Sequence, residues 1–198
     1  MFTKSSALLG GDLRKFHLLR LHNLFFYVVL PPHGKIVAMS DSIYSSQTYG
    51  ICPPQKLKKH IDAYLESEPA RTYRLVIGTD SQVKNGTEVD FVTALIIHRV
   101  GSGGIYFWRR TVEHKQYALK QRMFAEAIHS LSAAEEFLTL FKSNGIRKFD
   151  LEIHVDVGTK GETREVITEI IGMVRSSGFT VKTKPDSFGA SKVADRHT

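Results

Sequence analysis

The stretch from Arg74 to Gln82, Arg-Leu-Val-Ile-Gly-Thr-Asp-Ser-Gln, constrains the fold of this chain more than any other. Its apolar residues predict a short β-strand over 73–79 that runs directly into an acidic residue, Asp80. The turn signal Asn85-Gly86 follows. Such a strand holds a carboxylate rigidly at the edge of a sheet, where it can bind a metal ion or a substrate group. A lone aspartate at this place is more often a turn former, so the prediction depends on further acidic residues downstream.

The composition is that of an ordinary globular protein, with 198 residues, 42% hydrophobic and 24% charged. This length is sufficient for one domain with a substantial core and an appendage. The formal net charge of +7 favours a polyanionic partner such as nucleic acid, although many basic proteins bind none. Cys52 is the single cysteine, so neither a disulfide framework nor a Cys/His zinc site can form. A chain without disulfides is compatible with a reducing compartment, and we predict a cytoplasmic location.

Residues 1–38 differ from the rest of the chain. They carry +4 of the net charge, and their apolar run over 24–30 is too short to span a membrane as a helix. A basic stretch before a short apolar run is also typical of a signal peptide, but Pro31-Pro32-His33 follows without a small-x-small cleavage site. The remaining interpretations are a genuine strand, an anchor, or translated upstream sequence with Met39 as the true start. We favour the last, and predict an N-terminal extension over 1–38 that is not native and one domain over 39–198.

The periodicity of apolar residues after Met39 predicts alternating strands and helices. Residues 40–54 are polar and rich in turn formers, and an amphipathic helix follows over 55–68. Three strands over 73–79, 90–100 and 105–111 have short links, which favours an antiparallel meander. The remaining predicted elements are a helix over 117–144, a strand over 149–157, a helix over 162–177, a strand over 179–184 and a last helix from residue 187. The order from residue 73 is therefore β-β-β-α-β-α-β-α.

This order, together with four short motifs, resembles the ribonuclease H-like superfamily, and more narrowly the YkuK family of predicted ribonuclease H-related nucleases. The motifs are Ile77-Gly-Thr-Asp-Ser-Gln82, Gln121-Arg-Met-Phe-Ala-Glu126, Ile153-His-Val-Asp-Val157, and Lys184-Pro-Asp-Ser-Phe-Gly-Ala-Ser191 with Val193-Ala-Asp195. The resemblance covers residues 42–198. It implies an α/β fold with a mixed five-stranded sheet flanked by helices, and a nuclease that acts on nucleic acid.

The resemblance also implies which acidic residues act. The aspartate of the first strand corresponds to Asp80, the glutamate of the first long helix to Glu126, and the aspartate that ends the fourth strand to Asp156. The last acid corresponds to Asp195, with Asp186 as its rival, although capping of the last helix is a sufficient reason for Asp186. Each acid also has a structural interpretation, since Glu126 could lie on the surface of its helix and Asp156 could form a turn.

The expected chemistry gives these acids a shared task. Hydrolysis of a phosphodiester needs an activated water, in-line geometry and a neutralised leaving oxygen, and two divalent cations can supply all three. Hard cations such as Mg²⁺ and Mn²⁺ take oxygen ligands, which carboxylates provide. In this hypothesis Asp80 bridges the two ions, Asp156 and Glu126 hold one ion each, and Asp195 or Asp186 completes the second site.

Basic residues close in sequence to the last acids are predicted to contact substrate phosphates. They are Lys182, Lys184, Lys192, Arg196 and His197, and Arg109 and Arg110 would extend the same surface; a solvated basic face is the alternative. We also predict that His154 tunes the site or moves a proton, although a structural histidine is more frequent. The aromatic residues over 106–108 could stack on bases, but aromatic residues in a strand are more often core, and we predict core.

Three functions of different classes remain. The first is a metal-dependent nuclease, and the second is a catalytically inactive module that binds nucleic acid or a protein. The third is phosphoryl transfer of the actin-like ATPase kind, because Gly78-Thr-Asp-Ser81 resembles a first phosphate loop. That function needs a duplicated lobe, which 198 residues cannot supply. We predict the nuclease, with nucleic acid as its partner and no membrane partner.

Overall fold

The computed structural model describes residues 16–21, 24–29, 42–141, 150–157 and 164–198. The chain forms one compact unit over residues 1–37 and another over residues 38–198. In the first unit, β1 (Phe16–Leu21) and β2 (Leu24–Val29) pair as an antiparallel hairpin. The apolar run of the N-terminal extension therefore forms a strand. That the extension over 1–38 is not part of the native protein stays a prediction.

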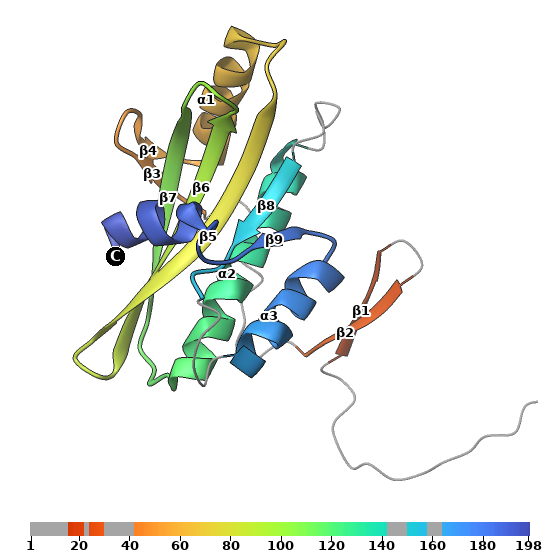
Figure 1. The fold of residues 1–198 in the computed structure, drawn as a ribbon, viewed down its shortest axis with the longest axis vertical. Coiled ribbons are helices and arrows are strands. Elements are labelled where there is room, and N and C mark those ends of the chain that lie inside the picture. Colours follow the sequence, from red (N-terminus) through yellow and green to blue (C-terminus); the bar gives the residue numbers. More distant parts are fainter. Residues whose placement is uncertain (1–15, 22–23, 30–41, 142–149, 158–163) are drawn as a thin grey trace, which may run out of the picture. The chain divides into compact units, whose positions relative to one another are not determined.

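The second unit is built on one mixed sheet with the strand order β4-β3-β7-β6-β5-β8-β9 (Figure 1). Its strands are β3 (Tyr44–Ser46), β4 (Gly50–Cys52), β5 (Tyr73–Lys84), β6 (Glu88–Arg99), β7 (Gly104–Glu113), β8 (Asp150–His154) and β9 (Thr180–Lys182). Its helices are α1 (Pro54–Ser67), α2 (Leu119–Phe141) and α3 (Arg164–Ser176). A π-helical segment, η4 (Gly189–Ala194), and a 3-10 turn, η5 (Asp195–His197), follow β9.

The predicted meander and fold class are confirmed. Strands β5, β6 and β7 pair antiparallel in sequence order, while β8 joins β5 and β9 joins β8 in parallel. The sheet has seven strands rather than the predicted five, because the turn-rich stretch before α1 contains the hairpin β3–β4, which pairs with β7. Strands of three residues each are too short to give a readable alternation of apolar and polar residues.

Strand β5 is longer than predicted, and this changes the setting of Asp80. It pairs with β6 from Tyr73 to Lys84, so Asp80 lies inside the strand, opposite Val92, and not at its end. The polar residues after Asp80 interrupt the apolar pattern, but their backbone groups still pair across the ladder. The strand ends at the predicted turn, where Asn85 and Gly86 have φ angles of 51° and 71°.

The two faces of the sheet are covered differently. One face packs against α1, α2 and α3 and contributes buried residues such as Leu75, Ile77 and Phe107 to the main core. The opposite face is crossed by η4, whose Ala194 packs on Val92 and Ala94 (Figure 1). The sheet is therefore enclosed at its centre, which fits strands that are apolar on both faces. Within the described residues, helices that combine the length and apolar character needed to cross a membrane are absent.

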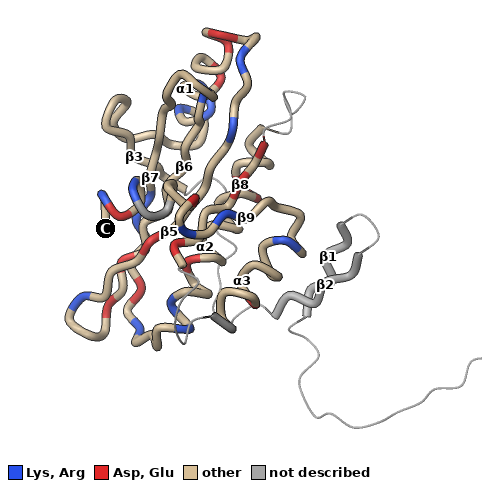
Figure 2. Tube along the Cα trace, viewed as in Figure 1, with Lys and Arg blue, Asp and Glu red and all other residues tan. Residues whose placement is uncertain are grey.

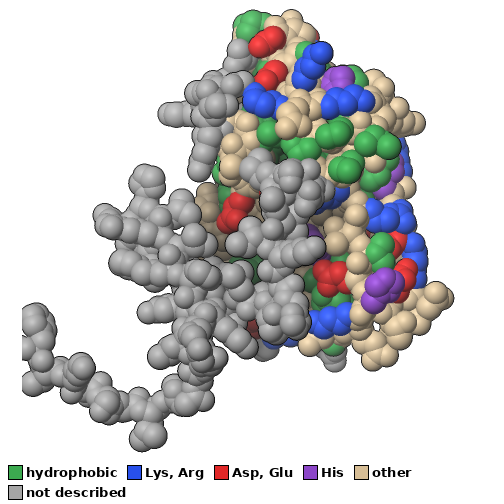
Figure 3. Space-filling view, turned by 180° about the vertical axis from the view of Figure 1, so that it is seen from behind, with side chains coloured by type: hydrophobic (Ala, Val, Ile, Leu, Met, Phe, Trp, Pro, Cys, Tyr) green, Lys and Arg blue, Asp and Glu red, His purple; other side chains and the backbone are tan. Residues whose placement is uncertain are grey.

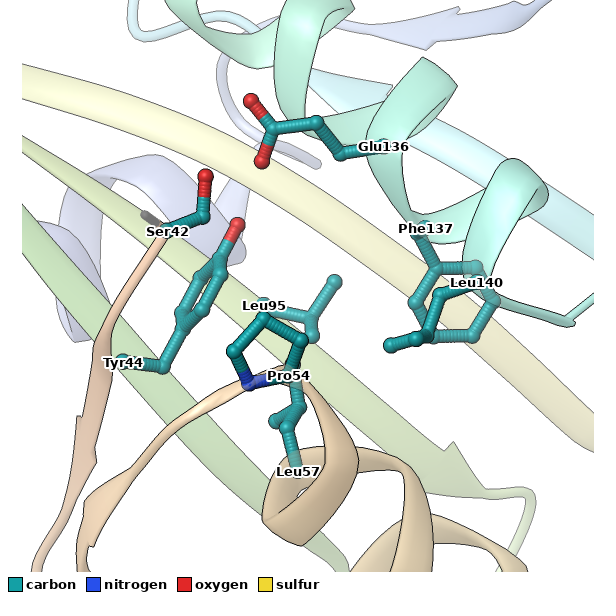
Figure 4. Close-up of a pocket in the computed structure, with 8 residues that line it drawn as sticks. All are labelled: Ser42, Tyr44, Pro54, Leu57, Leu95, Glu136, Phe137 and Leu140. Carbon is teal, nitrogen blue, oxygen red and sulfur yellow. The ribbon is translucent and has the colours of Figure 1, made fainter. Parts of the chain in front are cut away.

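A cavity of about 20 Å³ lies among β3, β6, α1 and α2 (Figure 4). At its rim, Arg109 Nη1 donates to Glu136 Oε2 at 2.5 Å and to Ser42 Oγ at 3.1 Å. The Arg109 side chain is only 13% exposed. This arginine therefore ties β7 to α2 and to the residues before β3, in place of the predicted extension of a phosphate-binding surface.

Candidate active site

The predicted acids meet where β8 stops beside β5. Strand β8 pairs with β5 only as far as Gly78 and His154, so the next residues of β5 border an opening and not a further strand. This opening is a pocket of about 270 Å³. Its lining residues are Asp80, Leu119, Arg122, Met123, Glu126, Asp156 and Val157. The carboxyl ends of parallel strands in an open α/β sheet are a frequent place for a binding site.

Figure 2 shows acidic positions of β5 and α2 close together in the middle of the sheet, with basic positions of β9 beside them. The same surroundings bring four of the five candidate acids into electrostatic contact. The charges of Asp156 and Asp195 both raise the pKa of Asp80, and those of Asp80 and Asp156 raise the pKa of Glu126. Asp80, Glu126 and Asp156 thus line one acidic pocket, and Asp195 on η5 adjoins it through Asp80.

Glu126 is a buried acid and not a surface residue of α2. It is 8% exposed, because it lies on the helix face that also buries Met123 and Ala127. Ser81 Oγ donates to its Oε1 at 2.5 Å, and Arg122 Nη1 donates to the Ser81 carbonyl at 2.9 Å. Burial, and then the charges of the neighbouring acids, raise the pKa of Glu126 to about 7, although the Ser81 hydroxyl and Arg122 oppose this shift.

Asp80 is half-buried on the sheet face opposite to Ser81, because side chains alternate along β5. Thr198 Oγ1 donates to its Oδ2 at 3.1 Å. Burial is the largest cause that raises the pKa of Asp80, followed among the raising causes by Asp195 and Asp156, while the Thr198 hydroxyl and the Ser81 backbone lower it. The carboxylate is therefore accessible at the pocket and short of positive charge.

Asp156 follows β8 and does not end it, since the strand stops at His154. The segment after β8 is still hydrogen-bonded to β9 through its backbone, since Val155 N donates to Lys182 O at 2.9 Å. Lys184 Nζ lies 3.1 Å from Asp156 Oδ1, as an ion pair without hydrogen-bond geometry. The predicted phosphate-binding lysine thus stands at the edge of the acidic pocket.

The two rivals for the fourth acid lie in different places. Asp195 begins η5, is exposed, and acts on the pKa of Asp80. Asp186 is exposed in the turn after β9, where its N–H donates to Thr183 O at 2.8 Å, and it is not among the principal charges that act on Asp80 or Glu126. The structure therefore brings Asp195, and not Asp186, close to Asp80.

His154 does not reach the pocket. It is 1% exposed, with Nε2 3.2 Å from Glu152 Oε2, and its Nδ1 accepts a hydrogen bond from Gly189 N at 3.1 Å. Because Nδ1 accepts, Nε2 carries the proton and donates to Glu152. Burial lowers the pKa of His154 and favours this neutral form. His154 therefore anchors η4 through Gly189, in place of the predicted role of tuning the site or moving a proton.

The other predicted phosphate-binding residues lie mostly on the surface. Lys192, Arg196 and Arg110 are exposed, and Arg110 also pairs with the buried Asp90 at 2.9 Å. Phe107 is core, as predicted, but Trp108 is half-buried on the opposite face. On the face seen in Figure 3, basic and acidic side chains of the described residues are interspersed. The described residues of this face therefore form no continuous basic surface.

Sequence reasoning missed Arg122, which lines the pocket and holds Ser81 against Glu126. Its signal was its place in the motif over 121–126, one helical turn before Glu126, so that both side chains lie on the same face of α2.

The donor set fits a hard divalent cation, since Asp80, Glu126 and Asp156 line the pocket with carboxylate oxygens and Asp195 lies close to Asp80. In the described part of the chain, however, the side chains as they stand do not bring three such ligands around one point. To hold an ion, the carboxylates must turn further into the pocket.

Comparison with known proteins shows the family of the chain. The chain matches the family Ribonuclease H-like over residues 56–198, and it belongs to that family. It is also 32% identical over 159 residues to "Uncharacterized protein YkuK" of Bacillus subtilis (strain 168), an alignment that covers 73% of this chain and 90% of the relative. Solved structures give no significant match.

Proposed function

We propose that this protein is a divalent-metal-dependent nuclease that hydrolyses phosphodiester bonds in RNA, DNA or a hybrid of the two. The observation that carries the proposal is Glu126, a buried carboxyl whose pKa is raised to about 7 partly by Asp80 and Asp156. Acids gathered in this way destabilise a fold unless a cation joins them, and they are typical of functional sites. Membership of the ribonuclease H-like family supports the same function, although a fold alone does not define one.

Each acid has a proposed role toward Mg²⁺ or Mn²⁺. Asp80 would bridge two ions, Glu126 and Asp156 would hold one each, and Asp195 would complete the second site. When bound, such ions supply Lewis-acid charge and an activated water. Ser81 orients the Glu126 carboxylate by its hydrogen bond, and Arg122 holds Ser81 in turn.

Basic residues around the pocket would bind the substrate backbone. Lys184 stands at the pocket edge beside Asp156, and Lys192 and Arg196 are exposed near Asp195. Contacts of this kind neutralise phosphates and make binding salt-dependent, without selecting a sequence.

A second candidate function is a module that binds nucleic acid without cleaving it. Two contacts favour it, because Lys184 pairs with Asp156 and Thr198 donates to Asp80. Both contacts engage carboxylates that a nuclease needs for its ions.

Cleavage of labelled RNA, DNA and hybrid substrates in Mg²⁺ and in Mn²⁺ separates the two candidates. We expect the wild type to cut at least one substrate and Asp80→Asn to cut none, since asparagine keeps the shape but loses the charge. Asp62→Asn is the matched control, because Asp62 lies on α1, paired with Lys58, and outside the residues that line the pocket. If no substrate is cut and calorimetry detects no bound metal, the proposed nuclease function is wrong. Binding of the same substrates would then support the second candidate, a module that binds nucleic acid without cleaving it.

A further inference from the structure

The residues after β9 carry Asp195 and Thr198 to Asp80, which lines the pocket. We call residues 189–198 the crossing segment, because η4 packs across β5 and β6. The end that bears Asp195 is a 3-10 turn of three residues without a side-chain cap. A turn this short has little stability of its own, so tertiary contacts must fix the position of Asp195.

The first contact lies at the start of the crossing segment. Gly189 N donates to the buried His154, and a Cβ at Gly189 would stand 2.5 Å from Val76 Cγ1. Only glycine fits this close approach. In the middle, Ala194 is fully buried against Val92 and Ala94. These contacts fix η4 but not the turn that follows it.

The second contact fixes the turn itself. The His197 ring stacks on Trp108 with centroids 3.7 Å apart and an interplanar angle of 5°. Arg110 Nη2 donates to the His197 carbonyl at 2.5 Å, and the same guanidinium pairs with the buried Asp90. Trp108 thus holds the side chain of His197 and Arg110 holds its backbone, and these two residues lie two positions apart on the same face of β7.

We propose that Trp108, Arg110 and His197 are positioning residues, an aromatic clasp that holds Asp195 and Thr198 against Asp80 and thereby sets the affinity of the pocket for its divalent cation. The inference deepens the proposed function and depends on it. None of the three residues lines the pocket, so their effect passes through the position of η5. In this arrangement, loss of the stack leaves Glu126 and Asp156 unchanged and displaces Asp195 alone among the four acids.

The chain contains a single tryptophan, so Trp108 reports on the clasp directly. We expect the intrinsic fluorescence of the metal-free protein to change in His197→Ala, whose Trp108 ring loses its stacked partner and becomes more exposed. His197→Phe restores an aromatic partner and should bring emission maximum and quencher accessibility back toward the wild type. His114→Ala, at an exposed histidine 79% accessible in its side chain, is the matched control and should leave the emission unchanged.

Titration of the same four proteins with Mg²⁺ by calorimetry tests the functional part. A stacked aromatic pair is worth a factor of about two to ten in an equilibrium constant, so His197→Ala should weaken Mg²⁺ binding by about that factor. His197→Phe should recover most of the loss, and His114→Ala should bind as the wild type does. A merely structural histidine would lower thermal stability without this recovery of metal affinity.

The outcomes separate the two proposals. Equal Mg²⁺ affinity in the wild type and His197→Ala would overturn the clasp and leave the metal site standing. Absence of both Mg²⁺ and Mn²⁺ binding in the wild type would overturn both proposals, since the clasp is defined by its effect on the affinity for the cation. Unchanged emission in His197→Ala would show that the stack is not formed in solution and would overturn the clasp alone.

Discussion

The four acids of the pocket form two pairs that the protein holds in different ways. The inner pair, Asp80 and Glu126, lies on β5 and α2, which are 12 and 23 residues long and packed into the main core. The outer pair, Asp156 and Asp195, lies on a connecting segment and on a 3-10 turn. Regular hydrogen bonding along long elements fixes the inner pair, while a few separate backbone hydrogen bonds and side-chain contacts fix the outer pair.

The two pairs therefore differ in how firmly the fold positions their carboxylates. The inner pair is preorganised, and its burial raises the pKa of both carboxyls. In the outer pair Asp195 is exposed and Asp156 is half-buried; Asp156 pairs with Lys184, and the position of Asp195 depends on the crossing segment. Functional groups held on rigid elements are more precise than those on loops, so substitutions in the two pairs should have unequal effects.

The largest expected effect is on cleavage. Asp80→Asn should lower the rate by about 10³-fold or more, because it removes several kcal/mol of charge stabilisation at the proposed bridging position. Asp195→Asn should lower it by only about 10- to 100-fold, as expected for a less tightly held ligand. Single-turnover rates with saturating Mg²⁺ measure both. Equal losses would show that the two pairs do not differ in function.

The next effect separates the crossing segment from the inner pair. Gly189→Ala places a Cβ 2.5 Å from Val76 Cγ1 and 3.3 Å from His154 Nδ1, so overpacking should destabilise the fold by about 1–3 kcal/mol. Thermal unfolding measures this loss. The same variant should weaken Mg²⁺ binding, because Asp195 follows the displaced segment.

Gly172→Ala is the matched control for this substitution. Gly172 lies inside α3, and a Cβ there would meet nothing within 4 Å. Alanine in a helix interior should stabilise the protein by about 0.5–1 kcal/mol. A Gly189→Ala variant as stable as Gly172→Ala would contradict the close packing of η4 on the sheet.

A further effect concerns the pH dependence of the inner pair. The pKa of Glu126 is about 7 in the folded protein against an ordinary value of 4.5, so the folded state retains a proton that the unfolded chain releases. Stability without metal should therefore fall as pH rises from about 4.5 to about 7 and then level off. Glu126→Gln should be more stable than the wild type by about 1–3 kcal/mol at pH 8 and equal to it at pH 4.

Denaturant unfolding at the two pH values measures this difference, with Glu169→Gln as control. Glu169 is 53% exposed on α3, and its substitution should change stability by less than about 0.5 kcal/mol at either pH. Mg²⁺ should stabilise the wild type at pH 8 far more than Glu126→Gln. A variant that gains equally at both pH values would show that the gain does not come from proton release.

The smallest effect is expected at the outer pair. Lys184 is 52% exposed, so Lys184→Ala should change stability by no more than about 0.5 kcal/mol despite its ion pair with Asp156. Binding of labelled nucleic acid should weaken, and the slope of log affinity against log salt should decrease by about one. Lys58→Ala, on α1, should leave that slope unchanged. An unaltered slope in Lys184→Ala would exclude a phosphate contact by this lysine.

The sequence was most informative where chemistry and regular periodicity coincide. The strand pattern before Asp80 and the apolar stripe of α2 around Glu126 gave both the elements and their order, because each is long enough to show its period. The boundaries were less accurate, since β5 continues past Asp80 and β8 stops before Asp156. Backbone pairing extends or ends a strand without regard to the polarity of single side chains.

His154 and Trp108 show what lay beyond the sequence. Because side chains alternate between the faces of a strand, His154 and Asp156 are expected on the same face. Only the fold reveals that η4 covers that histidine. Likewise, the stack of Trp108 on His197 joins residues 89 positions apart that no local pattern connects. Such contacts depend on how distant segments are brought together, and this information is not contained in any short window of residues.

The sequence by itself determined the fold class, the order of the elements and the acids that could meet, because these follow from local periodicity and from short motifs. Only the tertiary structure decided that Asp195 and not Asp186 approaches Asp80, and that Glu126 is buried enough for its pKa to reach about 7. It also decided that Arg109 pairs with Glu136 on α2 and does not extend a phosphate-binding surface. The physical reason is that burial and the distances between charges are properties of packed segments, and they arise only when the chain has folded.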